Sequence, residues 1–364
     1  MVVDDENPDG HSPALRWPLR SCPCGTASPS TCEATCPPGH MQAGPCGKYS
    51  GCITLRHPID HARRMRHLNA FTATAVLVLL TACASRPVSH PAPALSPAAS
   101  GWQAAVTAIA AGGDNGGRGQ AIVQRLDTLG IDWRRQDFEI DGFRGANLLA
   151  DIGGPADAPV LLLGAHFDKV DAGDGVTDNA SGSAVVLALA ERFRQQPLVR
   201  HQVAIAFWDL EERGLLGSRA HIAQGSEQPV LYVNFDVFGW GDTLWMMTPD
   251  PDSPLTVSTR TAANAAGLGL TTGGQYPPTD HEAFLKAGWP ANSYSLVDAD
   301  EIAGILAMYK GDTPGQVPKV MEVIHSDGDT LAAVDPEAVA RGIDVVEVAL
   351  RNWDAEGGTT GAND

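Results

Sequence analysis

The chain has 364 residues, of which 43% are apolar and 19% charged, and its formal net charge is −18. This apolar content can build a hydrophobic core, which excludes disorder throughout the chain, and the absence of any apolar run of about 18 residues excludes a polytopic membrane protein. A net-acidic chain repels phosphate backbones, so we expect no nucleic-acid partner.

The first segment of the chain differs in composition from the rest. All seven cysteines lie at or before Cys83. Residues 1–64 show neither a helix nor a strand period, and we interpret them as a non-native upstream extension or a disordered segment. The alternative is a small disulfide or zinc module, although its cysteine spacing matches no standard zinc pattern.

Residues 65–83 have the pattern of a secretory signal peptide: basic residues precede the short apolar run 71–80, and small residues follow it. The ending Leu-Thr-Ala-Cys resembles a bacterial lipobox, which implies a lipidated Cys83, and the following Ala84 suggests sorting to the outer membrane. We therefore expect a lipid-anchored protein in the bacterial cell envelope, on the periplasmic face of the outer membrane. Residues 84–100 are expected to form a Pro/Ala-rich tether.

Residues 101–353 are expected to form one catalytic domain, followed by a disordered tail over 354–364. The patterns predict helices at 102–111, 118–128, 180–195, 214–224, 254–266, 280–287 and 336–351. They predict strands at 131–140, 145–152, 159–164, 202–208, 230–237, 243–248 and 291–297. Strands separated by helices indicate an α/β three-layer sandwich, with helices on both faces of a mostly parallel, mixed central sheet. Residues 298–324 are expected to be irregular.

Polar side chains gather where the predicted strands end. They are His166, Asp168, Asp178, Glu211, Glu212, Asp236 and His325. In such sheets ligands bind beyond the carboxyl ends of the strands, so we expect these side chains to converge. Two histidines with three carboxylates form a mixed nitrogen and oxygen set that suits zinc.

Several of these residues also have simpler interpretations. Asp178 can cap the helix that begins near Ala180, and Glu211 with Glu212 can form a charged first turn. Asp168 can fix the tautomer of His166. His201 and His221 have no partner motif and are expected at the surface. Further aromatic and methionine residues, favoured as core rather than as pocket lining, are Phe238, Trp240, Met246 and Met247.

Six motifs together resemble a known family, the co-catalytic dizinc aminopeptidases of the bacterial leucyl aminopeptidase type, metallopeptidase family twenty-eight. The resemblance covers about residues 101–353, and the motifs lie at 164–170, 177–182, 211–218, 234–236, 279–284 and 325–330. It implies zinc-dependent removal of N-terminal residues from peptides that have a free N-terminus. A monomer is expected.

The resemblance also implies a role for each matching residue. Asp178 would bridge two Zn²⁺ ions, with His166 and Asp236 completing one site and Glu212 and His325 the other. Glu211 would be the general base that acts on a metal-bridging water, and Asp168 would orient His166. The peptide bond between Asp178 and Asn179 is expected to be cis.

Other protein classes remain as alternatives. Glutaminyl cyclases share the scaffold, use a single zinc and resemble this chain at Trp-Asp-x-Glu-Glu, residues 208–212. Zinc carboxypeptidases and deacylases of another family insert a lid domain of roughly 100 residues, for which the span from Asp236 to His325 leaves little room. A metal-binding, non-catalytic module would be expected to have lost ligands. A count of bound zinc and a substrate panel would separate these readings.

Overall fold

A computed structural model describes residues 94–358, all of which belong to one structural unit. The predictions for residues 1–64 and for the signal peptide with Cys83 lie outside the described residues, as do residues 84–93 of the expected tether and residues 359–364. Within the described part, no helix is both long enough and apolar enough to cross a bilayer.

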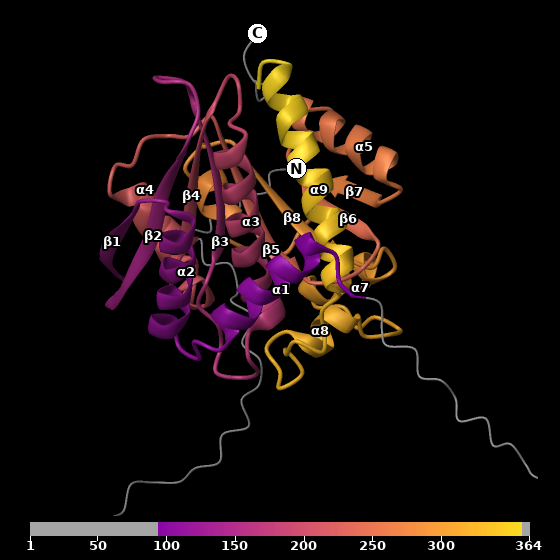
Figure 1. The fold of residues 1–364 in the computed structure, drawn as a ribbon. Coiled ribbons are helices and arrows are strands. Elements are labelled where there is room, and N and C mark those ends of the chain that lie inside the picture. The colour runs from indigo at the N-terminus through magenta and orange to yellow at the C-terminus, as the bar shows by residue number, and fades with distance from the viewer. Residues whose placement is uncertain (1–93, 359–364) are drawn as a thin grey trace, which may run out of the picture. The chain divides into compact units, whose positions relative to one another are not determined.

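A mixed eight-stranded sheet runs through this unit in the order β1-β2-β4-β3-β5-β8-β6-β7 (Figure 1). The strands are β1 (Trp133–Ile140), β2 (Phe143–Gly153), β3 (Val160–His166), β4 (Gln202–Trp208), β5 (Leu231–Phe238), β6 (Thr243–Met247), β7 (Gly269–Gly273) and β8 (Ala291–Val297). The central strands β4, β3, β5 and β8 are parallel to one another. Strands β2 and β6 join this centre antiparallel, at β4 and β8.

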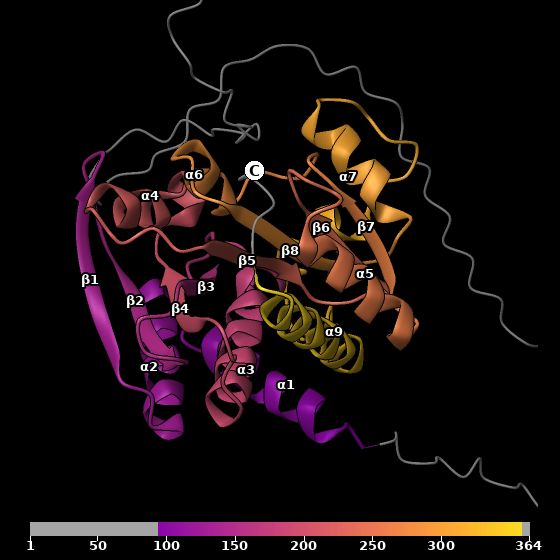
Figure 2. The same cartoon turned by 90° about the horizontal axis from the view of Figure 1, so that it is seen from above.

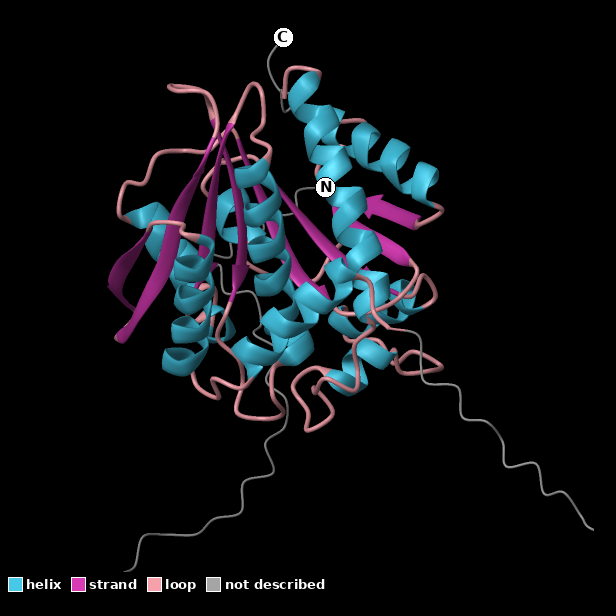
Figure 3. Cartoon of the chain, in the orientation of Figure 1, coloured by secondary structure: helices cyan, strands magenta, loops and turns pink. Residues whose placement is uncertain are grey.

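Helices cover both faces of the sheet. They are α1 (Pro97–Ala110), α2 (Asn115–Leu129), α3 (Ser181–Gln195), α4 (Leu216–Ala223), α5 (Pro254–Ala266), α6 (His281–Lys286), α7 (Glu301–Tyr309), α8 (Lys319–Val323) and α9 (Pro336–Ala355). Seen from above, α4 and α6 lie on one face, and α1, α3 and α9 lie on the other (Figure 2). The predicted α/β three-layer sandwich is confirmed (Figure 3).

Strand β3 shows why the sequence folds in this way. Its apolar run supplies both layers, because successive side chains point to opposite faces of a sheet. Leu161 and Leu163 join the large core beneath α1, α3 and α9, while Leu162 joins a smaller core with Trp208 beneath α6. A strand covered on both faces needs this continuous apolar sequence, and its polar residues are confined to its end.

The domain extends beyond the expected limits of 101 and 353. Helix α1 begins at Pro97, where the side chain of Ser96 accepts a hydrogen bond from the Ala99 amide. Ser96 also donates its backbone N–H to Glu337 of α9 over 2.6 Å, so the end of the expected tether is part of the folded unit. At the other end α9 continues to Ala355, and Asp354 is buried at 2% exposure.

Some local expectations are wrong. Residues 298–324 are not irregular throughout, since they contain α7 and α8, and β7 was not predicted. His201 and His221 are buried rather than exposed, at 3% and 6% exposure. His201 stacks on Trp353, with 4.5 Å between ring centroids. The expected core residues Phe238, Trp240, Met246 and Met247 are indeed buried.

Candidate metal centre

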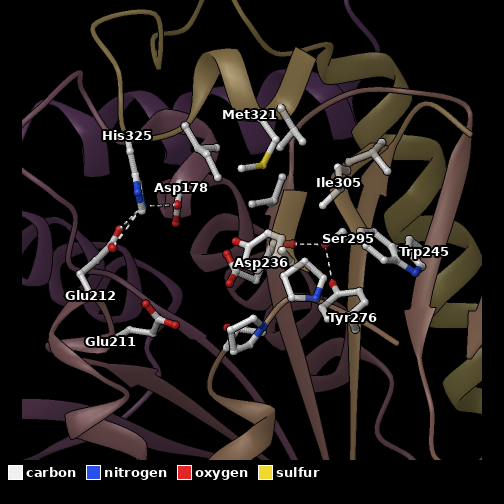
Figure 4. Close-up of a pocket in the computed structure, with 18 residues that line it drawn as sticks. Asp178, Glu211, Glu212, Asp236, Trp245, Tyr276, Ser295, Ile305, Met321 and His325 are labelled. Atoms are coloured by element: carbon white, nitrogen blue, oxygen red, sulfur yellow. Dashed lines mark hydrogen bonds and ion pairs between the residues drawn. The ribbon is translucent and has the colours of Figure 1, made fainter. Parts of the chain in front are cut away.

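The predicted site residues converge at the carboxyl edge of the central strands. His166 is the last residue of β3, and Asp236 lies near the end of β5. Asp178 lies in a short helical turn, η1 (Val176–Ala180), between β3 and α3, and Glu212 lies in a second turn, η2 (Glu211–Arg213), after β4. His325 follows α8. Five separate segments of the fold therefore bring side chains to one site. Figure 4 shows Asp178, Glu212, Asp236 and His325 at this site.

The five predicted ligands form two groups that share Asp178. One group is His166, Asp178 and Asp236, the other is Asp178, Glu212 and His325, and within each group the ligand atoms lie within 4.8 Å of one another. His166 Nε2 is 3.1 Å from Asp178 Oδ1 and 3.4 Å from Asp236 Oδ1. His325 Nε2 is 3.2 Å from Asp178 Oδ2 and 3.2 Å from the Glu212 carboxylate. The two oxygens of Asp178 thus face different histidines.

Asp168 connects two of these segments. Its carboxylate accepts the backbone N–H groups of Glu211 and Glu212 at 3.0 Å and 3.2 Å, which fixes the turn after β4. One of its oxygens also lies 3.3 Å from His166 Nδ1. Asp168 therefore lies beside His166, and it also holds the glutamate turn, which sequence reasoning did not anticipate.

Glu211 lines the same cavity but belongs to neither group of ligands. Burial raises the pKa of its carboxyl well above the usual range, and the neighbouring charges of Asp280, Asp236 and Glu212 raise it further. Burial, followed by the charge of Asp178, also raises the pKa of Glu212. Crowded buried carboxylates of this kind favour either protons or bound cations.

The cavity has two sides of opposite character (Figure 4). The acidic side is formed by Asp178, Glu211, Glu212 and Asp236, together with His325. The other side is apolar and aromatic, with Trp245, Tyr276, Ile305, Met321 and other residues lining it. Tyr309 of α7 also lines this cavity. Phe238, Trp240, Met246 and Met247 do not line it.

Two further aspartates near the site, Asp329 and Asp280, are buried and differ in their hydrogen bonds. Asp329 accepts the backbone N–H groups of Thr177 and Asp178 at 2.6 Å and 3.2 Å. Asp280 does not cap α6, and within residues 94–358 neither of its oxygens has a hydrogen-bond partner. Burial is the main cause that raises its pKa to about 7.

The residues present fit divalent metal ions. Asp236 Oδ1 is buried and has no hydrogen-bond partner in the described part of the chain, although it lies beside His166 Nε2. Each group offers one imidazole and two carboxylates, which is a donor set that zinc accepts. The peptide bond between Asp178 and Asn179 is cis, as expected.

Comparison with known proteins agrees with this site. The model of peptidase family M28 matches residues 147–350, which span the predicted ligands from β3 to His325. The chain belongs to peptidase family M28. The family predicted from the sequence motifs is therefore confirmed, whereas the lipoprotein character remains a prediction.

One relative of this M28 chain is a longer protein. It is 32% identical over 251 residues to leupeptin-inactivating enzyme 1 of Streptomyces exfoliatus, an alignment that covers 65% of this chain and 54% of that protein. The chain thus spans about half the length of this relative.

Solved structures show the same fold. The Legionella pneumophila LapA aminopeptidase matches with a TM-score of 0.55 and 17% identity, over 70% of this chain and 71% of that one. A Porphyromonas gingivalis glutaminyl cyclase matches with a TM-score of 0.56 and 21% identity, over 71% and 98%. At these identities the likeness concerns the fold alone, and the two proteins are named for different activities.

Proposed function

We propose that this M28 chain is a zinc-dependent aminopeptidase that holds two Zn²⁺ ions. The observation that carries the proposal is that Asp178 presents one oxygen to each of two ligand groups, while Glu211 stands beside both groups and belongs to neither. His166 and Asp236 would hold one ion with Asp178, and Glu212 and His325 the other. When bound, zinc supplies Lewis-acid chemistry, which polarises a carbonyl oxygen and makes water a stronger acid.

The protein's own groups then have defined tasks. Glu211 is the general base: its carboxylate accepts a proton from the attacking water and later donates a proton to the leaving amine nitrogen. Asp168 keeps His166 in position and anchors the backbone that carries Glu211. The apolar side of the cavity accepts the first side chain of a peptide, which places its free N-terminal amine near the carboxylates and the metal ligands on the other side. This arrangement supports exopeptidase action at a free N-terminus.

One experiment separates this proposal from its main alternative. Purified protein is assayed for zinc content and for turnover of aminoacyl amides, N-terminally blocked peptides and peptides with N-terminal glutamine. We expect two zinc ions per chain, release of free N-terminal residues and no turnover of blocked peptides. One zinc ion together with cyclisation of N-terminal glutamine would instead support the glutaminyl cyclase reading, for which the similar fold is the argument.

We further propose that Cys83 is lipidated and anchors the protein at the periplasmic face of the outer membrane, on the basis of the lipobox-like ending of residues 65–83. The test is mass spectrometry and membrane fractionation of the protein expressed in a bacterial host, beside a Cys83→Ser variant. We expect Cys83 to carry a diacylglyceryl group and the protein to be in the membrane fraction. The Cys83→Ser variant should lose both the modification and the membrane location. An unmodified Cys83 would exclude the anchor.

A further inference from the structure

Arg118 is a fully buried cation beside the metal centre that the proposed mechanism does not use. It lies in the first turns of α2 and is 0% exposed. Its guanidinium donates to three backbone carbonyl oxygens: Nε to Phe167, Nη1 to Asp174 over 3.0 Å, and Nη2 to Gly175 over 3.0 Å. Its hydrogen-bond partners are therefore main-chain atoms and not carboxylates, which is unusual for a buried charge.

These three carbonyls belong to the two ends of one loop, which runs from β3 to η1. Phe167 lies between His166 and Asp168, and Gly175 directly precedes η1, which carries Asp178. The planar fork of an arginine can hold several acceptors at fixed mutual positions. Arg118 thus ties the point at which the loop leaves His166 to the point at which it reaches Asp178.

The approach of α2 to this loop is close. The residue after Arg118 is Gly119, and a Cβ atom added there would lie 3.3 Å from the Phe167 ring. Asp329 holds the same part of the chain. Its backbone carbonyl accepts the Asp174 N–H over 2.9 Å, and its carboxylate accepts the N–H groups of Thr177 and Asp178 in η1. The end of the loop is therefore held by both Arg118 and Asp329.

Neighbouring carboxylates account for the charge of Arg118, but not for its hydrogen bonds to the loop. Burial lowers the pKa of Arg118 to about 10, while the charges of Asp168, Asp178, Asp329 and Glu212 act in the opposite direction. The guanidinium is consequently charged at neutral pH, and a positive charge beside a cation site weakens cation binding by simple repulsion. A favourable effect of Arg118 on metal binding would therefore come from the three hydrogen bonds that hold the loop, and not from its charge.

We propose that Arg118 is a positioning residue of the metal centre, which holds His166 and Asp178 at the spacing required for a shared ion before the metal arrives. The inference rests on the proposed function in one respect, namely that the two ligand groups bind Zn²⁺.

The test measures zinc affinity of the full chain after metal removal, by competition with a chelator of known affinity. Arg118→Met removes the charge and all three hydrogen bonds, whereas Arg118→Lys keeps the charge but loses the fork. Arg125→Met is the matched control, because Arg125 lies on the same helix and pairs with Glu191 at the surface, over 2.7 Å. We expect both Arg118 variants to bind zinc about 10- to 100-fold more weakly, as when groups that orient metal ligands are lost. The control should stay within about twofold.

Two outcomes would overturn the inference. If only the charge of Arg118 mattered, Arg118→Met would bind zinc more tightly and Arg118→Lys would be unchanged. Equal zinc affinity in all variants would show that the loop keeps its conformation without the hydrogen bonds of Arg118. Circular dichroism checks that each variant is folded.

A measurement on the unsubstituted, metal-free chain covers the case in which the variants do not fold. There we expect the Arg118 Nε–H proton to exchange slowly with solvent, and rapid exchange would contradict the inference. Failure of the unsubstituted chain to bind zinc would instead refute the proposed function, and the exchange measurement would still decide whether Arg118 holds the loop.

Discussion

Asp178 illustrates how a single side chain is oriented by neighbours that bind no metal. Asn179 donates from Nδ2 to the Phe235 carbonyl over 2.9 Å and accepts the Gly182 N–H over 2.9 Å. Asp329 holds the amide of Asp178 itself. These hydrogen bonds hold the backbone that presents the Asp178 carboxylate to the two histidines, as the proposed sharing of Asp178 between two ions would require.

The position of Glu211 leads to a prediction about catalysis. Glu211→Gln keeps the shape of the side chain but removes the proton acceptor, so turnover should fall by about 10²-fold or more. Zinc content, measured by atomic absorption, should not change, because Glu211 is in neither ligand group.

Glu212→Gln provides the comparison for this prediction. Glu212 belongs to one ligand group, so its substitution should lower the zinc content as well as the activity. Loss of zinc in Glu211→Gln, or full activity in that variant, would mean that the roles of the two glutamates are assigned wrongly.

The buried His221, which is not a predicted metal ligand, leads to a prediction of how the unfolding free energy depends on pH. Burial, with a smaller effect of the Arg134 charge, lowers its pKa to about 4, and its ring packs against Trp208 at 5.0 Å. The unfolded chain binds a proton near pH 6.5, whereas the folded chain does so only near pH 4. The contribution of His221 to stability is therefore complete above about pH 6.5 and is lost as the pH falls toward 4, by about 3 kcal/mol at most.

Chemical denaturation of the metal-free chain and of His221→Asn, at several pH values, measures this effect. Asparagine retains an N–H group that can reach Gln136, the partner of His221 Nδ1. The difference in unfolding free energy between the two proteins should shrink between pH 6.5 and pH 4. A difference that is independent of pH would show that His221 does not titrate as described.

At the residue scale, the sequence was sufficient for the candidate ligands but not for the residues that support them. His166, Glu212 and Asp236 were predictable because polar residues at strand ends meet at one edge of a parallel sheet. Asp178 and His325 lie in η1 and after α8 instead, and their roles came from the resemblance to the family. Arg118 was not predictable, because an arginine on an amphipathic helix is usually exposed and its partners are backbone carbonyls. His201 and His221 are buried by contacts from distant segments, which a local pattern does not reveal.

At the element scale, the predictable parts were those with long and regular patterns. Strands β3 and β4 are nearly continuous apolar runs, which are typical of strands covered on both faces. Strand β7 has the sequence Gly-Leu-Thr-Thr-Gly, which contains no such run. Helix α7 is apolar on several sides because it packs against α8 and the cavity wall, and α8 is only five residues long. Their structure depends on the domain around them.

The end of α9 gives a prediction about stability. Asp354 accepts the N–H groups of Val199 and Arg200 at 2.7 Å and 3.0 Å, and it pairs with His201 at 2.8 Å. Asp354→Ala leaves the buried His201 and two partly buried backbone N–H groups without this partner, so the unfolding free energy should fall by about 2–4 kcal/mol.

Urea denaturation measures this loss, and Asp344→Ala is its control on the same helix. Asp344 pairs with Arg192 at the surface, where its side chain is 62% exposed, so its removal should change stability by less than about 1 kcal/mol. Equal effects of the two substitutions would show that α9 is not fastened by Asp354. Zinc affinity should be unaffected in both, because Asp354 bonds to residues just before β4 and the candidate metal site lies beyond the other end of that strand.

At the scale of the whole molecule, the acidic cluster predicts a stabilising effect of metal. A ligand present at about 1,000 times its dissociation constant stabilises the folded state by about 4 kcal/mol, which corresponds to roughly 10 °C in a domain of this size. The thermal unfolding midpoint should therefore fall when a chelator is added. Zn²⁺ should restore it and Mg²⁺ should not, because each ligand group contains an imidazole. An unchanged midpoint in chelator would argue against a metal centre.

The distribution of the ligands along the chain also determines when metal can be acquired. The closest pair, His166 and Asp178, is separated by a loop, and Glu212 and His325 are 113 positions apart. An unfolded or half-synthesised polypeptide consequently has no compact chelating stretch, in contrast to a zinc finger, whose metal drives folding. Loading should be the last step of maturation, and a chain that crosses a membrane unfolded would collect its ions in the compartment where it folds.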